Sequence, residues 1–191
     1  MPWNLPNALT LLRIVLIPLF VVVFYLPYAW AFPASALLFA LAGATDWLDG
    51  YLARRLGQTS SFGAFLDPVA DKLLVAVALV ALVDRHGGGS LWLAVPAMVI
   101  IGREIVISAL REWMAELGKR ASVAVSFLGK LKTTVQILAI LLLLYHHPLF
   151  GLPTHETGLV LLNLAAALTL WSMVYYLMGA RRAVQQALDS R

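Results

Sequence analysis

Hydrophobic residues dominate this chain in six long runs, which short segments rich in proline, glycine or charge separate. The runs cover about residues 9–28, 32–52, 65–83, 91–110, 125–145 and 158–178. Each is close to the roughly 20 apolar residues that a helix needs to cross a bilayer. The breaks contain the residue types that end helices. The pattern therefore predicts an all-α fold, with six transmembrane helices in a single domain over residues 1–191.

The composition agrees with a membrane protein. Hydrophobic residues make up 61% of the 191 residues and charged residues 13%, whereas soluble domains carry about 25% charged residues. The first run lacks the basic n-region and the small-residue cleavage site of a signal peptide, so we expect no cleavage there. There is no cysteine, which excludes disulfides.

Lysine and arginine are distributed unequally between the two ends of the predicted helices. Six crossings place both termini on one side, and that side receives all of the 14 basic residues except Arg85. Positive residues accumulate in cytoplasmic loops of membrane proteins. We therefore expect both termini in the cytoplasm. The formal net charge of +4 suits an anionic leaflet and anionic substrates, and it calls for no nucleic-acid partner.

Four aspartates interrupt the second and third runs, namely Asp46, Asp49, Asp67 and Asp71. The first two are three residues apart and the last two are four apart, so each pair lies on one helix face. A turn over residues 57–62 would join the two helices as an antiparallel hairpin. At about 1.5 Å per residue, all four aspartates lie roughly 8–17 Å from this turn. They therefore share one band near the cytoplasmic interface.

Ionised carboxylates in such a band need compensating cations. Inserting each one into a membrane helix costs about 3 kcal/mol, and neighbouring carboxylates also repel one another. Hard oxygen donors without a nearby cysteine or histidine favour Mg²⁺ or Mn²⁺, and two such ions could hold a diphosphate. One alternative is a set of ion pairs with Arg54 and Lys72 that only orders the bundle. Another is a cation or proton pathway.

A second group of charges lies in the fourth and fifth runs. At about 1.5 Å per residue, Arg103 is roughly 19 Å from the outer end of its helix, on the level of the aspartates. Arg111 follows two turns later, and Lys130 and Lys132 open the fifth run. Cations of this kind suit a phosphate dianion. The alternatives are an ion pair between Arg103 and Glu104 or another carboxylate, and cytoplasmic anchoring for the other three.

Three polar residues near the N-terminus share one face of the first predicted helix. Asn7, Thr10 and Arg13 follow one another at intervals of three residues, which places them on the same side. They could contact a nucleotide or a lipid phosphate. They could equally form a helix cap followed by an interfacial anchor. The spacing leaves both interpretations open.

The aspartates belong to a longer motif, Asp-x2-Asp-Gly-x2-Ala-Arg-x8-Gly-x3-Asp-x3-Asp, from Asp46 to Asp71. This motif resembles the signature of the CDP-alcohol phosphatidyltransferases, and every fixed position of that signature is filled. Further stretches resemble the bacterial members that make phosphatidylglycerol phosphate: Leu5–Pro18, Gly102–Arg120 and Gly129–Gln136. Together with the six predicted helices, the resemblance covers nearly the whole chain.

The resemblance implies a reaction and assigns residues to it. The enzyme would transfer the phosphatidyl group of CDP-diacylglycerol to the 1-hydroxyl of sn-glycerol 3-phosphate, giving phosphatidylglycerol phosphate and CMP. The four aspartates would hold two Mg²⁺ or Mn²⁺ ions, with Asp71 also the general base. Gly50, Ala53, Arg54 and Gly63 would contact the CDP group. The protein would be a homodimer among the lipids of the bacterial cytoplasmic (inner) membrane, with its active site facing the cytoplasm.

Other functions remain as alternatives. Within the family the acceptor could be inositol phosphate, serine or phosphatidylglycerol; the basic residues favour a phosphorylated acceptor, and the choice of glycerol phosphate rests on the resemblance. Intramembrane prenyltransferases carry two separated Asp-rich motifs, and a cation or proton transporter needs acids along a path between both faces. Here the four aspartates cluster in one predicted hairpin, which favours the transferase.

Overall fold

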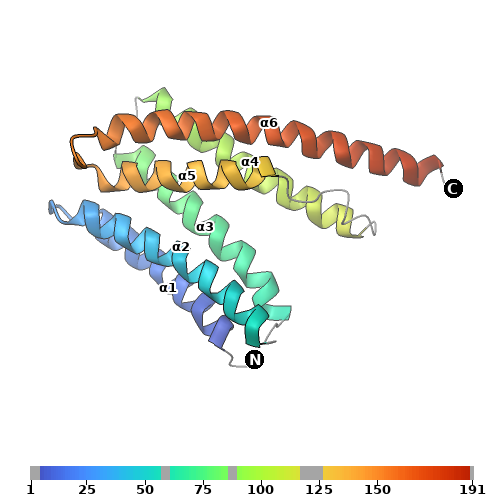
Figure 1. The fold of residues 1–191 in the computed structure, drawn as a ribbon, viewed down its shortest axis with the longest axis horizontal. Helices are drawn as coiled ribbons and strands as arrows, with labels where there is room; N and C mark the ends of the chain where they lie inside the picture. Colours follow the sequence, from blue (N-terminus) through green and yellow to red (C-terminus); the bar gives the residue numbers. More distant parts are fainter. Residues whose placement is uncertain (1–4, 57–60, 86–89, 117–126, 190–191) are drawn as a thin grey trace. The chain divides into compact units, whose positions relative to one another are not determined.

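The fold consists of helices throughout the residues that the computed structural model describes, which are 5–56, 61–85, 90–116 and 127–189. Within these ranges there are six helices and no strand, as Figure 1 shows. They are α1 (Leu5–Phe24), α2 (Ala31–Leu56), α3 (Ser61–Arg85), α4 (Leu91–Glu116), α5 (Phe127–Tyr145) and α6 (Thr154–Asp189). The prediction of an all-α fold built on six apolar runs is thereby confirmed.

Several helices differ in length from the hydrophobic runs that predicted them. The first helix ends at Phe24, whereas its run continues to residue 28. The last helix continues to Asp189, well past the end of its run at residue 178. The extension is rich in alanine, glutamine and arginine, which are strong helix formers. An apolar run therefore marks the hydrophobic part of a helix, whereas helix propensity extends the helix beyond that run.

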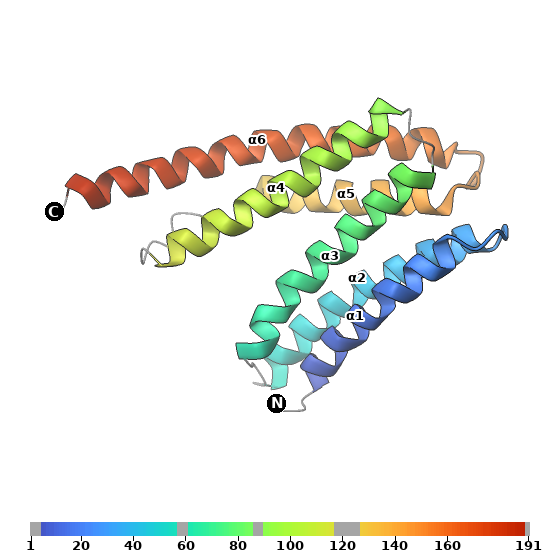
Figure 2. The ribbon, with the colours of Figure 1, turned by 180° about the vertical axis from the view of Figure 1, so that it is seen from behind.

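The described residues divide into two compact units. One comprises residues up to 85 together with 140–158, and the other comprises residues from 90 to 139 together with 159 onward. In the first unit, α1 and α2 run side by side while α3 meets them at one end and then diverges, as both ribbon views show (Figures 1 and 2). Phe20, Phe24 and Leu82 are fully buried there. In the second unit, Ile107 and Met114 of α4 pack against Tyr176 of α6.

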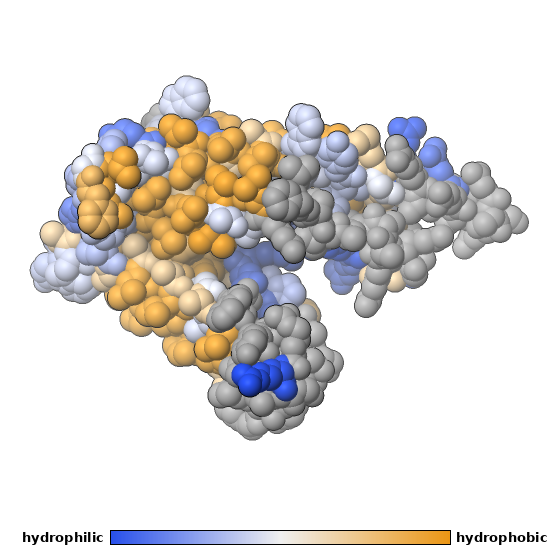
Figure 3. Space-filling view, viewed as in Figure 1, coloured by the Kyte–Doolittle hydropathy of each residue, from blue (hydrophilic) through white to orange (hydrophobic). Residues whose placement is uncertain are grey.

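Two helical segments are long and apolar enough to cross a membrane, Leu91–Glu116 and Thr154–Arg181. Shorter apolar helical segments occur at Ala8–Phe24, Ala31–Thr45 and Leu131–Tyr145. Large apolar side chains lie exposed on these helices, and Figure 3 shows them covering much of the visible surface. Extended apolar surface of this kind marks a contact with lipid or protein. The structure therefore supports membrane association, while the number of crossings and the side of the termini remain predictions.

Candidate functional site

The two halves of the aspartate motif lie on α2 and α3. Asp46 and Asp49 fall in the C-terminal half of α2, as do Gly50, Ala53 and Arg54. The backbone there is helical as expected, and these five side chains lie outside the described part of the structure. Gly63, Asp67 and Asp71 fall in the first half of α3. Their spacing of four residues places them one above another on a single face of α3.

Both described aspartates receive a hydrogen bond from α1. The Thr10 hydroxyl donates to Asp67 Oδ1 at 2.6 Å. The Arg13 guanidinium donates to Asp71 Oδ1 through Nη1 at 2.7 Å, which makes an ion pair. Thr10 and Arg13 are themselves buried, with Arg13 fully so. The two donors are three residues apart on α1, and the two acceptors are four residues apart on α3. Each separation is about one helical turn, so the two pairs face each other.

Arg13 also reaches the second helix of this unit. Its Nε donates to the Ala42 carbonyl oxygen of α2 at 3.1 Å and lies 3.4 Å from the Thr45 hydroxyl oxygen. A single buried guanidinium therefore joins α1, α2 and α3. A buried cation of this kind persists only where its donors are paired. The pairing makes Arg13 an internal counter-ion of the aspartate motif.

The structure decides part of the question about the N-terminal polar residues. Arg13 is fully buried, so its interpretation as an interfacial anchor is wrong. Thr10 and Arg13 contact the aspartates, and a direct contact with nucleotide or lipid stays a prediction. Asn7 lies in α1, and its side chain is outside the described residues. The signal that could have revealed these contacts is the match between the polar spacing on α1 and that on α3.

The donors that the structure describes in this motif fit a hard divalent cation. Asp67 and Asp71 present carboxylate oxygens one helical turn apart, and both are partly exposed. A carboxylate can accept a hydrogen bond at one oxygen and still coordinate a cation with the other. Among the described residues there is no group of three acidic or histidine side chains. A set of three or more such ligands would therefore need donors beyond the described side chains.

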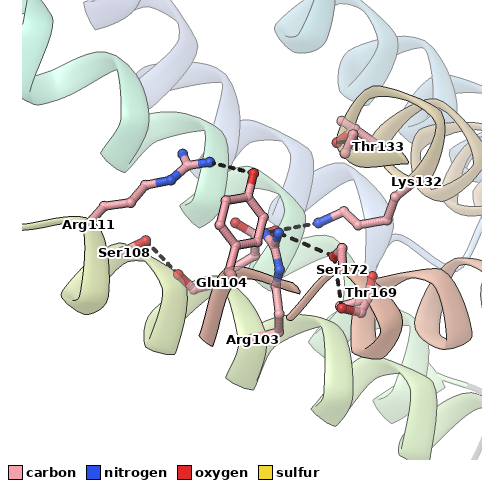
Figure 4. Close-up of polar contacts among 10 residues, drawn as sticks. Arg103, Glu104, Ser108, Arg111, Lys132, Thr133, Thr169 and Ser172 are labelled. Atoms are coloured by element: carbon pink, nitrogen blue, oxygen red, sulfur yellow. Dashed lines mark hydrogen bonds and ion pairs between the residues drawn. The ribbon is translucent and has the colours of Figure 1, made fainter. Parts of the chain in front are cut away.

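A second polar cluster lies in the other unit, where α4, α5 and α6 each contribute side chains (Figure 4). Glu104 is at its centre. Its Oε1 accepts a hydrogen bond from Arg103 Nη1 at 2.9 Å and another from Lys132 Nζ at 2.8 Å. Both cations are almost completely buried. The ion pair between Arg103 and Glu104 that the sequence offered as an alternative is therefore present.

Arg111 joins the same cluster through an aromatic ring. Its Nη2 donates to the Tyr176 hydroxyl at 3.1 Å. The guanidinium carbon of Arg111 lies 5.4 Å from the centre of the Tyr176 ring, and that of Arg103 lies 5.5 Å from the same centre. These distances are within the range of cation–π contacts. Tyr176 therefore lies between two arginines.

Three of the four basic residues predicted to bind the acceptor are thus brought together by the structure. Arg103, Arg111 and Lys132 share contacts with Glu104 or Tyr176. Lys130 lies in α5, and its side chain is outside the described residues. Two buried cations, Arg103 and Lys132, face the Glu104 carboxylate, and the exposed Arg111 adds a third positive charge nearby, so the cluster carries an excess of positive charge. Such an excess attracts an anion.

Sequence reasoning missed the contribution of α6 to this cluster. Thr169, Ser172 and Tyr176 are polar residues at intervals of three and four in an otherwise apolar run. All three are buried. Such spacing puts them on one helix face, and that periodicity is a signal that the sequence contained. For this cluster the sequence-based prediction names charged residues only.

We expect that replacing Arg13 by alanine destabilises the protein. Hydrogen bonds to charged groups contribute about 1.5–3 kcal/mol, and the Asp71 side chain is 44% exposed, so the loss should fall near the lower figure. The free energy of unfolding in detergent measures the effect. Leu12→Ala is the control, because Leu12 is an exposed neighbour on α1. Equal stability of the Arg13 and Leu12 variants would contradict the counter-ion role.

The sequence also matches known proteins over most of its length. Residues 3–174 match the family model of the CDP-alcohol phosphatidyltransferases. A curated relative in Salmonella typhimurium, CDP-diacylglycerol–glycerol-3-phosphate 3-phosphatidyltransferase, is 56% identical over 181 residues, which are 95% of this chain and 97% of the relative. The protein of the same name in Escherichia coli is 55% identical over the same shares of both chains. This chain therefore belongs to the CDP-alcohol phosphatidyltransferase family.

Proposed function

We propose that this protein transfers the phosphatidyl group of CDP-diacylglycerol to the 1-hydroxyl of sn-glycerol 3-phosphate. The products are phosphatidylglycerol phosphate and CMP. The observation that carries the proposal is the identity of 55% or more with relatives that bear this reaction in their name, across 95% of the chain. The filled aspartate motif from Asp46 to Asp71 supports the same chemistry.

The aspartates of α2 and α3 form the diphosphate side of the proposed site. Asp46, Asp49, Asp67 and Asp71 would together hold two divalent cations, Mg²⁺ or Mn²⁺. Bound ions supply neutralising charge to the diphosphate and to the CMP leaving group. In support, the described carboxylates of Asp67 and Asp71 lie one turn apart and are partly exposed, while Thr10 and Arg13 hold one oxygen of each.

Asp71 is the proposed general base. Its carboxylate would accept the proton of the acceptor hydroxyl as that oxygen attacks phosphorus. Arg13 orients one carboxylate oxygen at 2.7 Å, which supports a defined direction for the group. Phosphoryl transfer depends on positioning and charge more than on covalent help from the protein. The buried Arg13 guanidinium would position the Asp71 base in this way.

The CDP group is proposed to lie against Gly50, Ala53, Arg54 and Gly63. Of these, Gly63 is within the described side chains and is buried on the same face of α3 as Asp67. Glycine and alanine allow a ligand to approach the backbone closely. Arg54 would add a cation to the diphosphate. Asn7, one turn before Thr10, is proposed to contact the nucleotide or the lipid.

The second cluster is proposed to bind the phosphate of the acceptor. Arg103, Arg111 and Lys132 supply the described cations, and Lys130 would add a fourth. Guanidinium groups bind phosphate oxygens through paired donors. Burial of Arg103 and Lys132 strengthens such contacts because little water competes.

The proposed setting is the bacterial cytoplasmic membrane, which the chain would cross six times. Both termini and the active site would lie on the cytoplasmic side, and the assembly would be a homodimer.

Phe150 lies in the turn between α5 and α6 and is 98% exposed. The chain has no cysteine, so Phe150→Cys and Ser190→Cys give single labels. An impermeant maleimide should reach residue 150 from outside and residue 190 only after permeabilisation; the opposite result would reverse the topology. The mass of the purified assembly tests the homodimer.

The reaction is tested by CMP release from the purified protein with CDP-diacylglycerol and Mg²⁺. We expect release with sn-glycerol 3-phosphate and none with inositol phosphate, serine or phosphatidylglycerol. Asp71→Asn should lower the rate by about 100-fold or more, since general bases contribute that much. Release with a different acceptor would refute the acceptor assignment. Failure of every acceptor with folded protein would refute the transferase.

Arg103→Ala should affect the KM values of the two substrates differently. Loss of a buried phosphate contact should raise KM for sn-glycerol 3-phosphate by about tenfold or more and leave KM for CDP-diacylglycerol nearly unchanged. Arg181→Ala is the control, because Arg181 is an exposed basic residue of α6. Steady-state kinetics with each substrate varied in turn gives both constants. A change confined to KM for CDP-diacylglycerol would contradict the assignment of Arg103 to the acceptor.

A further inference from the structure

The guanidinium of Arg103 is only partly used by its neighbours. Glu104 accepts from Nη1 at 2.9 Å. Nη2 makes a long contact of 3.5 Å with the Ser172 hydroxyl oxygen, and Nε is buried without a hydrogen-bond partner in the described structure. Nε and Nη2 form one edge of the guanidinium, and this edge matches two oxygens of a phosphate or carboxylate. The edge that suits an oxyanion is therefore the one that makes no short hydrogen bond in the described structure.

A hydroxyl group of α6 is also buried without a partner. Thr169 is fully buried, and its Oγ1 has no hydrogen bond in the described structure. Ser172 connects Thr169 to Arg103, because its hydroxyl donates to the Thr169 carbonyl oxygen at 2.9 Å and lies beside Arg103 Nη2. Figure 4 shows Thr169 and Ser172 together on the side of Arg103 that faces α6. Buried polar groups are normally satisfied, and the unused groups on both helices, Arg103 Nε and Thr169 Oγ1, could bond to an anion.

Glu104 explains why Arg103 presents this edge. The carboxylate holds Nη1 of Arg103 and Nζ of Lys132 on the same oxygen. Glu104, whose side chain is 25% exposed, thus fixes two buried cations from α4 and α5 and uses one donor of each. The remaining charge stays positive. The carboxylate therefore sets the direction of Arg103 without neutralising the cluster.

We propose that Thr169, Ser172 and the Nε–Nη2 edge of Arg103 bind the phosphate of the acceptor, and that Glu104 is the positioning residue for this subsite. The inference rests on the proposed function and adds to it two uncharged residues of α6 and one acid. A phosphate dianion receives two parallel bonds from Arg103 and one from the Thr169 hydroxyl. Ser172 gives a fourth when its single proton turns to the phosphate from the Thr169 carbonyl oxygen, which accepts it in the described structure. The anionic charge balances the excess that Glu104 leaves.

The Thr169 hydroxyl is tested by two substitutions. Thr169→Val removes the hydroxyl and keeps the shape, whereas Thr169→Ser keeps the hydroxyl. We expect Thr169→Val to raise KM for sn-glycerol 3-phosphate about 5- to 20-fold, as for a lost hydrogen bond to a charged group, and Thr169→Ser to stay within about twofold of the parent. Equal KM values for the valine and serine variants would overturn the proposal.

The positioning role of Glu104 is tested by measuring KM for each substrate, because a purely structural role would not change one KM value alone. Glu104→Gln should raise KM for sn-glycerol 3-phosphate about tenfold with unchanged KM for CDP-diacylglycerol. Glu112→Gln is the matched control, since Glu112 is an exposed acid of the same helix. A drop in kcat alone, or equal changes in both KM values, would show that Glu104 serves stability only. Lower stability with an unchanged KM for sn-glycerol 3-phosphate would show the same.

A binding measurement separates this inference from the proposed reaction. We would record the rise in the unfolding midpoint that inorganic phosphate and sn-glycerol 3-phosphate each give to the purified protein. The parent and Ser108→Ala should be stabilised, because the Ser108 hydroxyl bonds only within its own helix, while Thr169→Val and Ser172→Ala should lose most of the rise. If the parent is stabilised and the variants are not, the subsite stands even where the acceptor is another phosphate ester. If all respond equally, the subsite is refuted although the reaction is intact.

Discussion

Buried charges in these apolar helices need polar partners, and two of the described ion pairs join neighbouring helices. An unpaired ion in such a setting is costly. In one unit Arg13 of α1 meets Asp71 of α3, and in the other Glu104 of α4 meets Lys132 of α5. Each pair fixes how far one helix is shifted along the other. The chemistry of the site and the packing of the helices therefore depend on the same ion pairs.

The two polar clusters differ in the charge that remains after pairing. Among the described side chains of the aspartate motif, the Arg13 guanidinium pairs with Asp71 and the uncharged Thr10 bonds to Asp67, and two further motif aspartates lie on α2. In the second cluster the Glu104 carboxylate contacts Arg103 and Lys132, and Arg111 lies nearby on the Tyr176 hydroxyl. An excess of negative charge suits cations, and an excess of positive charge suits a phosphate. A reaction between a diphosphate and a phosphorylated alcohol needs both.

The sequence predicted the helices well because their apolar runs are long. Because charge is rare in such runs, the sequence also singled out Asp67 and Asp71 as candidate site residues. In the same way it singled out Arg103, Arg111 and Lys132, which the structure brings together. It could not show that Thr10 and Arg13 contact the aspartates, since that depends on how α1 lies against α3. Spacing along one helix says which residues share a face, whereas the facing helix decides their partners. The last apolar run ends at residue 178, whereas α6 continues to Asp189 because helix propensity rather than hydrophobicity favours the helix there.

The role of uncharged residues was the least accessible to sequence reasoning. Thr169 and Ser172 are common residues in apolar helices, where a hydroxyl often bonds to its own backbone. Only the structure shows that the Thr169 hydroxyl is buried without such a bond. Glu104 was considered solely as an ion-pair partner, and its central place between two helices follows from the contact with Lys132.

The central claim is that the aspartates of α2 and α3 hold the cations that bind the diphosphate. The most direct test is binding of Mn²⁺ by the purified protein, followed by electron paramagnetic resonance with and without CMP. The claim predicts saturable binding that CMP strengthens and that Asp67→Asn abolishes, with no loss in Asp84→Asn, an exposed acid near the other end of α3. Unchanged Mn²⁺ binding in Asp67→Asn would contradict it.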